Sequence, residues 1–258
     1  LNFHNQTNYH LRRAVYYLQN ALAVCSDDKI HSNTSNKPHI DPLPVILSYR
    51  AYDGEYAENL YEEITRAKSG SEKMKFTYSV GSYNLWDGIQ RQFPNESDKY
   101  RYEFSYKYFF KAFEFTKTLN DTMYFSKSLA WLLRTHPDHD NSEKIENFYR
   151  EKINSFCGSK SIVDCLDFGK NSSGVLADLA EALYEIGLYN EAKILYQHIV
   201  DKINLLIDFE DPDSDPAKAS IHNVHFKLGL IHMKRGNIDM AIDNYNNAIE
   251  IITQSDET

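Results

Sequence analysis

Apolar and polar residues alternate with helical spacing along most of the chain, and most clearly near its end. In residues 222–252 the apolar positions recur every three or four residues, which is the period of an amphipathic helix. Gly236-Asn237 interrupts this period, as a glycine just past the last helical residue commonly does. The pattern predicts a helix, a tight turn and a second helix.

The faces of these two helices carry residues that allow close packing. Leu228 and Gly229 in the first helix let a partner helix approach closely, while Ala241, Tyr245 and Ala248 give the second a face of small, large and small residues. This order resembles the tetratricopeptide repeat (TPR), whose unit is 34 residues long. The resemblance implies an all-α, right-handed solenoid of helical hairpins that acts by binding other proteins.

Earlier parts of the chain repeat this pattern, some regularly and some only in part. Residues 106–139 and 173–203 each read as a helix, a turn and a helix, whereas residues 8–100 and 140–172 contain degenerate helices. We therefore expect residues 1–258 to form a single TPR-like solenoid with several degenerate repeats.

The degenerate first part is predicted to contain short helices separated by breaks. Residues 8–25 form an amphipathic helix, and Tyr56 to Ala67 form another. A helix from Lys73 to Val80 is expected to end at Gly81, since glycine weakens a helix interior, and a further helix is expected over residues 83–93.

Composition and charge narrow the class of protein. With 10 Gly and 7 Pro in 258 residues, the chain has few of the turn residues that a sandwich of many short strands requires. The net charge is -9 and basic residues form no stripe, so a nucleic-acid partner is not expected. No apolar run approaches the roughly 20 residues that span a bilayer, so membrane insertion is not expected either.

The cysteines and glycosylation signals leave the compartment open. Cys157 and Cys165 could form a disulfide, with Cys25 left over, or all three thiols could be free and buried. The chain begins with Leu1, which fits a processed protein or a boundary inside a longer one. Both the secretory lumen and the cytoplasm are therefore kept open. The Asn-x-Ser/Thr signals that permit a secretory location are at Asn5, Asn33, Asn95, Asn120 and Asn171.

The TPR resemblance also implies where a partner would bind. In this family the first helix of each unit lines a concave groove, and its groove-facing positions can be mapped onto the three clearest repeats. The candidate partner-binding residues are Phe110, Glu114, Lys117, Glu181, Tyr184, Phe226, Leu230 and Lys234.

The chemistry of these positions favours one kind of ligand. A clamp for an acidic C-terminal tail uses Lys and Asn, whereas these positions are largely aromatic, apolar or acidic. An extended or helical peptide from another protein fits better, and a proline-rich peptide suits such a groove because polyproline II loses little entropy on binding. The alternative is that Phe110 and Phe226 simply pack against neighbouring helices.

Motifs for catalysis or cofactor binding are missing from the sequence. It contains no glycine-rich phosphate loop after a strand, no GxSxG and no HExxH, so we predict no catalytic residues, no cofactor and no enzyme activity. His222, His225 and His232 share one helix face without a nearby carboxylate, which favours packing or a pH-sensitive contact over a metal site.

A second resemblance covers residues 102–149. This segment is similar to the tyrosine-led repeats of the leprecan family, which comprises the prolyl 3-hydroxylases and cartilage-associated protein, and to the peptide-binding repeat of prolyl 4-hydroxylase. The leprecan repeats carry Cys-x-x-x-Cys pairs, which this chain lacks. The resemblance implies a non-catalytic module that binds proline-rich or collagen chains in the secretory pathway. It rests on Tyr106, Tyr108, Ala112, Asn120, Asp121, Pro137, Asn147 and Tyr149.

Overall fold

The computed structural model describes residues 54–84, 98–138, 140–166, 172–207 and 221–255. Every regular element in these ranges is an α-helix, which confirms the predicted all-α class. The predicted helix at residues 8–25 lies outside the described residues. The helices are α3 (Gly54–Thr65), α4 (Gly70–Asn84), α6 (Asp98–Leu119), α7 (Thr122–Thr135), α8 (Ser142–Cys157), α9 (Ile162–Leu166), α10 (Ser172–Glu185), α11 (Tyr189–Ile207), α12 (Ile221–Lys234) and α13 (Ile238–Ser255).

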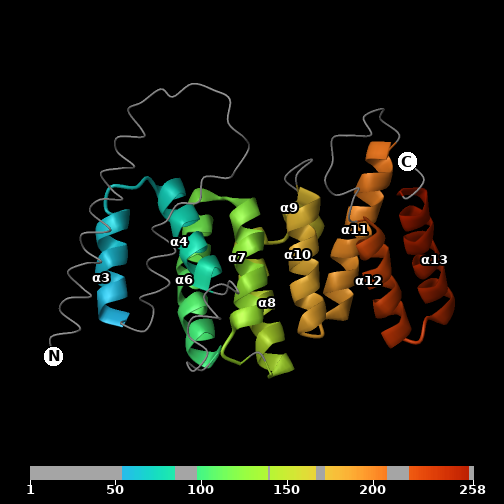
Figure 1. The fold of residues 1–258 in the computed structure, drawn as a ribbon, viewed down its shortest axis with the longest axis horizontal. Coiled ribbons are helices and arrows are strands. Elements are labelled where there is room, and N and C mark those ends of the chain that lie inside the picture. The colour runs from blue at the N-terminus through green and yellow to red at the C-terminus, as the bar shows by residue number, and fades with distance from the viewer. Residues whose placement is uncertain (1–53, 85–97, 139, 167–171, 208–220, 256–258) are drawn as a thin grey trace.

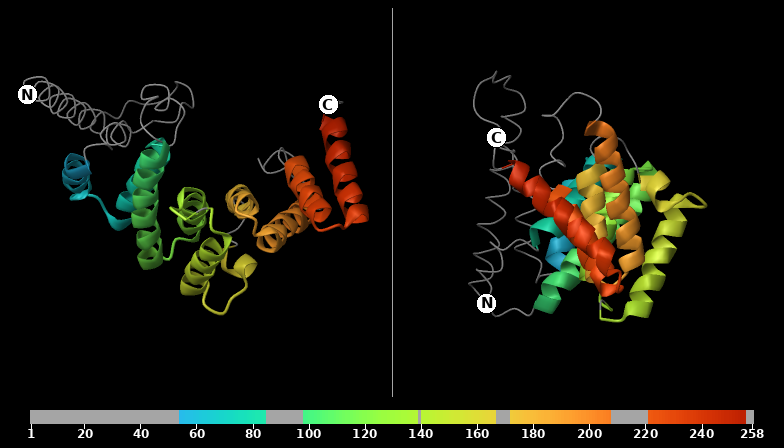
Figure 2. Two further views of the ribbon diagram at one scale, coloured as in Figure 1. Left: turned by 90° about the horizontal axis from the view of Figure 1, so that it is seen from below. Right: turned by 90° about the vertical axis from the view of Figure 1, so that its right-hand side faces the viewer.

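The helices stand side by side in chain order, from α3 at one end to α13 at the other (Figure 1). The left view of Figure 2 shows that they follow an arc, with α8 and α9 on its outer side. Among the described helices the closest packing joins α4 with α6, α6 with α7, α7 with α10, α10 with α11 and α12 with α13. This arrangement is a TPR-like solenoid of helical hairpins.

Three of the hairpin turns share one local geometry, which confirms the turns predicted from sequence. Each turn contains one residue with positive φ, namely Asn120 (51°), Gly187 (86°) and Gly236 (75°). Glycine and asparagine tolerate this left-handed conformation better than other residues do. In each turn an amide also donates to the carbonyl oxygen five residues earlier. These bonds join Asp121 to Thr116, Leu188 to Leu183 and Asn237 to His232.

Gly81 does not end a helix, so the predicted break there was wrong. Helix α4 runs without interruption through Gly81 to Asn84. A Cβ atom added to Gly81 would lie 3.1 Å from ring atoms of Phe109 on α6. The glycine therefore allows two helices to approach closely, and their contact outweighs its low helix propensity.

One apolar core runs along the array from α6 to α12. It includes Phe109, Leu132 and Leu183, none of which has measurable exposed surface. A smaller cluster joins α3, α4 and α6 around Tyr61 and Tyr108. Burial raises the pKa of Tyr61 to about 12, and its hydroxyl shares a 2.7 Å hydrogen bond with Thr77.

The segment between the two clearest early repeats departs from the regular array. Helix α10 packs directly on α7, although α8 and α9 lie between them in the chain. Helix α8 contacts α7 mainly through side chains, such as Phe156, whose ring stacks on Phe125 with centroids 3.8 Å apart. The degenerate helices predicted within residues 140–172 thus correspond to α8 and α9, which form an outer layer and do not separate α7 from α10.

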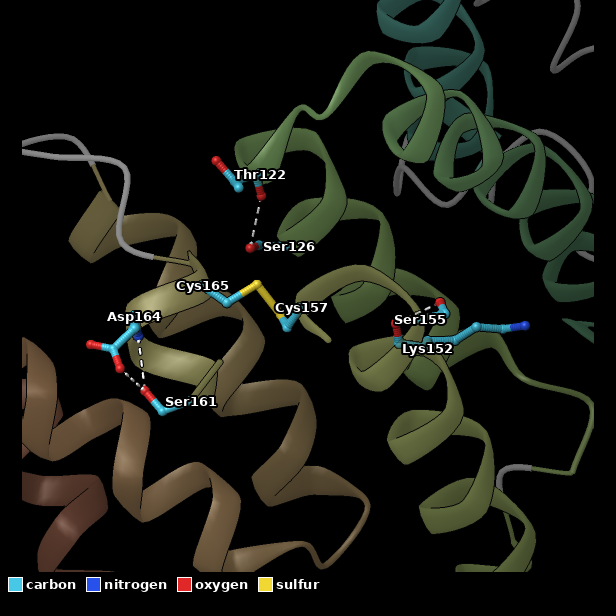
Figure 3. Close-up of a disulfide and its surroundings, with 8 residues drawn as sticks. All are labelled: Thr122, Ser126, Lys152, Ser155, Cys157, Ser161, Asp164 and Cys165. Carbon is cyan, nitrogen blue, oxygen red and sulfur yellow. Dashed lines mark hydrogen bonds between the residues drawn. A yellow bond between two sulfur atoms is a disulfide. The ribbon is translucent and has the colours of Figure 1, made fainter. Parts of the chain in front are cut away.

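A disulfide joins the end of α8 to α9 (Figure 3). Cys157 and Cys165 are bonded, with their Cα atoms 5.4 Å apart, which decides between the two states left open by the sequence. The Oγ atom of Ser161 accepts a hydrogen bond from the backbone amide of Asp164 at the start of the short helix α9. The disulfide and this hydrogen bond fasten a five-residue helix that is too short to be stable alone.

Removing this disulfide should lower stability. The double substitution Cys157→Ser and Cys165→Ser is expected to lower the free energy of unfolding by about 2 kcal/mol, because the unfolded chain regains the entropy of a short closed loop. Urea unfolding monitored by circular dichroism would measure the change. Reducing agent should shift the wild-type curve equally and leave the double variant unchanged. Alkylation of three thiols per unreduced, denatured chain would contradict the bridge, since only Cys25 should then react.

Candidate functional site

A strip of alternating aromatic and charged side chains connects α7, α10 and α12. We call it the aromatic–charged strip. Its members come from three helices that are neighbours in space, although the first and last members are 103 residues apart in the chain (234 − 131). They are Trp131, Arg134, Glu181, Tyr184, Glu185, Lys227 and Lys234.

Arg134 ties α7 to α10 at one end of the strip. Its Nε donates to Oε2 of Glu185 at 2.7 Å, and its Nη2 donates to the backbone oxygen of Asp178 at 3.3 Å. The guanidinium carbon lies 5.3 Å from the ring centroid of Trp131, a cation–π distance. Arginine suits this position because its planar group can stack on an aromatic face while it donates at its edge.

Trp131 is held in place from the other side by aromatic residues. Its ring is nearly parallel to that of Phe109, with an angle of 4° between the ring planes and 5.6 Å between the centroids. Burial raises the pKa of Tyr78, while a hydrogen bond with Trp131 opposes part of that rise. The indole is therefore fixed between a buried ring and Arg134, and it remains half-buried at the surface.

Glu181 is the centre of the strip and joins three helices. Its Oε2 accepts a 2.7 Å hydrogen bond from Tyr196 on α11, and its Oε1 accepts a 2.5 Å bond from Lys227 on α12. Burial, followed by the Glu181 hydrogen bond, raises the pKa of Tyr196, so this phenol stays protonated and acts as the donor. A single carboxylate thus fixes the spacing of α10, α11 and α12.

Lys234 and Tyr184 form the other end of the strip, beside Tyr189 of α11. The rings of Tyr184 and Tyr189 lie with centroids 5.4 Å apart. The Nζ atom of Lys234 is 5.0 Å from the Tyr189 centroid and 5.8 Å from the Tyr184 centroid, while that of Lys227 is 5.0 Å from Tyr184. A hydrogen bond with Tyr189 raises the pKa of Lys234.

The strip offers a ligand both exposed aromatic surface and hydrogen-bond donors. Its two glutamates already pair with Arg134 and Lys227, while Lys234 lies beside two tyrosine rings, and such partly exposed ion pairs each contribute at most about 1 kcal/mol to stability. A strongly charged ligand would have to separate these pairs before binding. The half-buried rings of Trp131 and Tyr184 still present some surface that suits apolar or prolyl groups, while Arg134 and the two lysines can donate to backbone carbonyl oxygens.

The eight candidate residues derived from sequence fall into three neighbourhoods. Glu181, Tyr184 and Lys234 belong to the strip. Phe110 faces α8, where Nζ of Lys152 lies 5.4 Å from its ring centroid.

On the same helix as Phe110, Glu114 and Lys117 form an ion pair of 3.4 Å with each other. The structure therefore does not bring these three α6 residues together with the candidates on α10.

Phe226 and Leu230 lie on α12 near the end of the array. Phe226 is 47% exposed, and its ring centroid is 5.8 Å from that of Tyr245 on α13. Leu230 is half-buried. Phe226 therefore packs against a neighbouring helix, as the alternative interpretation expects, and about half of its surface remains exposed.

Trp131 and Arg134 belong to the strip, but reasoning from sequence did not find them. The groove rule selects residues from the first helix of each unit, whereas both of these lie on α7, the second helix of its unit. They neighbour α10 because α8 and α9 are displaced to the outer side of the arc. The i, i+3 spacing of a tryptophan and an arginine was the available signal, since it places both on one helix face.

Two of the three histidines of α12, His225 and His232, are buried in the packing of the helices. His225 is 9% exposed and lies 3.2 Å from Oδ1 of Asn244, while His232 is 1% exposed. In the part of the chain that the structure describes, no group of three or more His, Cys, Asp or Glu side chains could hold a metal ion. None of the described helices is long and apolar enough to cross a bilayer.

His232 should make stability depend on pH. Burial, helped by Lys193 and Arg235, lowers its pKa, and within the described residues its Nδ1 has no hydrogen-bond partner. The folded protein therefore favours neutral His232, and this contribution is lost as pH falls below the ordinary value of about 6.5. His232→Phe should flatten the loss of stability between pH 7.5 and 5.5, measured by urea unfolding. Equal pH dependence in both proteins would contradict this prediction.

A cavity of about 260 Å³ opens between α8 and the turn from α10 to α11. Arg150, Glu191 and Arg235 are among its lining residues. The Arg150 guanidinium already donates to Glu146 at 2.7 Å and to Glu191 at 3.0 Å. The Arg150–Glu191 pair fastens α8 to α11, while the Arg150–Glu146 pair lies within α8, and together they give the cavity a structural explanation.

Comparison with known proteins gives no match in sequence and distant likenesses in structure. No protein-family model and no curated protein matches the chain. Two of the solved structures that are similar to the chain illustrate the distance, with TM-scores below 0.5. Kinesin light chain TPR-like repeats from Podosopora anserina have a TM-score of 0.49 and 11% identity, covering 85% of this chain and 100% of that one. The apo form of RapI has a TM-score of 0.35 and 16% identity, covering 97% and 96%.

Proposed function

We propose that this protein is a non-catalytic scaffold that binds an extended peptide segment of another protein along the aromatic–charged strip. The observation that carries the proposal is the arrangement of Trp131 and Tyr184 on adjacent helices, each with a cationic group beside its ring. Rigid aromatic side chains contribute large contact area at a low entropy cost, and polar groups beside them fix the orientation of the ligand.

The rigidity of the strip supports a preformed binding surface. Glu181 and Arg134 each bond to more than one partner across helix boundaries, so the rings are positioned before a ligand arrives. Preorganisation increases affinity because fewer side chains lose freedom on binding. The internal pairing of the charges favours a ligand of low net charge over an acidic tail.

Fluorescence anisotropy with labelled peptides would test this function. The probes are decaproline, an acidic decapeptide and a Gly-Ser decapeptide. Decaproline should bind at least tenfold more tightly than the other two. Tyr184→Ala should weaken its binding about tenfold, equivalent to about 1.4 kcal/mol. Phe110→Ala is the matched control, because this ring lies away from the strip, and it should change affinity less than twofold. No binding at millimolar decaproline, or an unaffected Tyr184→Ala protein, would overturn the proposal.

A second candidate is a module that binds collagen-like, proline-rich chains in the secretory pathway, as the leprecan resemblance implies. The disulfide between Cys157 and Cys165 favours it, because disulfides persist mainly in oxidising compartments. Asn120, the first residue of an Asn-Asp-Thr signal, is exposed at the turn between α6 and α7. Its position leaves it accessible for N-glycosylation.

Mass spectrometry of the native protein separates the two candidates. The secretory candidate requires a glycan on Asn120 or another signal and a bonded Cys157–Cys165 pair. In the anisotropy experiment it also requires tighter binding of a Gly-Pro-Pro repeat than of decaproline. Free cysteines together with unoccupied signals would reject it and leave the general scaffold function standing.

A further inference from the structure

An exposed apolar seam runs along α13 at the end of the array. We call it the terminal seam. Its residues follow a spacing of four, three, four and three, which places them on one face of the helix. Its four isoleucines are 43–59% exposed, with Ile249 the most exposed. The terminal seam consists of Ile238, Ile242, Tyr245, Ile249 and Ile252.

The preceding hairpin shows how the equivalent face of its second helix is covered. Helix α11 occupies the same place in the preceding hairpin, and aligning its Ala192 with Ala241 matches Tyr245 to Tyr196. The following seam positions, Ile249 and Ile252, correspond to Val200 and Ile203.

On α11 these equivalents, Tyr196, Val200 and Ile203, are only 2%, 5% and 1% exposed. Helix α12 packs on α11 and belongs to the same apolar core. The terminal seam therefore has the shape of a surface that receives another helix.

The charge beside the seam limits what that helix can be. Helix α13 carries Asp239, Asp243 and Glu250 and has no lysine or arginine. Two copies of α13 placed seam to seam would bring six carboxylates together without a base to pair them. A helix with basic residues beside its apolar stripe would instead pair with these acids and match the seam.

We propose that the terminal seam is a docking site for an amphipathic helix of another protein, with apolar residues at i, i+3 and i+4 spacing and lysine or arginine beside them. Phe226 extends the seam onto α12, because its ring contacts Tyr245. Gly229 allows this geometry, since a Cβ there would lie 2.5 Å from the Tyr245 ring. This surface is separate from the aromatic–charged strip and requires a different ligand.

A designed peptide tests the proposal directly. The probe is a fluorescein-labelled 18-residue helix with leucine at the i, i+3 and i+4 positions and lysine elsewhere. Its controls are a scrambled peptide of the same composition and a leucine–glutamate version. The leucine–lysine helix should bind best, with an affinity that falls as salt rises. Equal binding of the scrambled peptide would overturn the proposal, because it would indicate attraction to net negative charge alone.

Two sets of variants locate the binding on the seam. Ile242→Asn with Ile249→Asn should weaken the leucine–lysine helix at least about tenfold. Asp243→Asn with Glu250→Gln should weaken it about threefold and reduce its salt dependence. Asn247→Ala changes an exposed α13 residue outside the seam and should leave affinity unchanged. Circular dichroism should show that all three proteins remain helical.

Unchanged affinity in the isoleucine variant would refute the site. Sedimentation velocity adds a separate arm, in which a wild-type dimer that the isoleucine variant abolishes would assign the seam to a second copy and overturn the proposal. The seam variants leave Tyr184 and Arg134 intact, so decaproline binding reports independently on the proposed function.

Discussion

Substituting Phe109 with alanine is expected to lower the free energy of unfolding by about 3–5 kcal/mol, the usual range for removing a fully buried phenylalanine. This ring joins three helices, because it stacks on Trp131 of α7, contacts Tyr78 of α4 and lies against Gly81. Its loss would leave a cavity where α4, α6 and α7 meet, which the neighbouring rigid rings cannot fill. Urea unfolding monitored by circular dichroism would measure the change.

The matched control for this prediction is Phe226→Ala. Phe226 is 47% exposed and contacts one ring, so its removal should lower stability by about 1 kcal/mol or less. Hydrogen exchange should show that Phe109→Ala weakens protection in α4, α6 and α7 more than in α13, since each unit of a solenoid contacts mainly its neighbours. Similar losses for both substitutions would contradict the core position assigned to Phe109.

Substituting Gly229 with valine is expected to lower the free energy of unfolding by about 2–3 kcal/mol through overpacking between α12 and α13. Even a Cβ atom alone would lie 2.5 Å from Cε1 and 2.7 Å from Cδ1 of Tyr245. The ring would have to leave its place over α12, and the small face formed by Ala241 would then lose its contact. Hydrogen exchange in α12 and α13, together with urea unfolding, would report the loss.

Two controls separate crowding from a general effect of replacing glycine. Gly174 in α10 has open space where a Cβ would be added, so Gly174→Ala should keep or raise stability by up to about 1 kcal/mol. Combining Gly229→Ala with Tyr245→Ala should restore part of the stability lost by Gly229→Ala alone, because the clashing ring is absent. Additive losses in that pair would show that the Tyr245 contact is not the cause.

The repeat signals led directly to the last two hairpins and their turns. Gly236 was predicted to break a helix and a turn was predicted within residues 173–203; Gly236 and Gly187 adopt the positive φ that glycine favours in these two turns. Gly81 shows the limit of the same reasoning. A glycine that breaks a helix and one that admits a neighbouring ring look alike in sequence, and only the position of Phe109 distinguishes them.

The candidate site was predictable in part for a related reason. Glu181, Tyr184 and Lys234 were found because α10 and α12 are regular first helices of their units. Trp131 and Arg134 were missed because the irregular segment at residues 140–172 changes which helix neighbours α10.

By itself the sequence determined the all-α class, the helical hairpins and their turns, since apolar periodicity and turn glycines act over a few residues. The tertiary structure decided which helices are neighbours, and therefore that α7 contributes to the aromatic–charged strip while Phe110 faces α8. It also decided that Ile249 and Ile252 of α13 are exposed, whereas the equivalent Val200 and Ile203 of α11 are buried. The exposure of a helix face depends on whether another helix packs against it, and the spacing of residues within one helix does not reveal that contact.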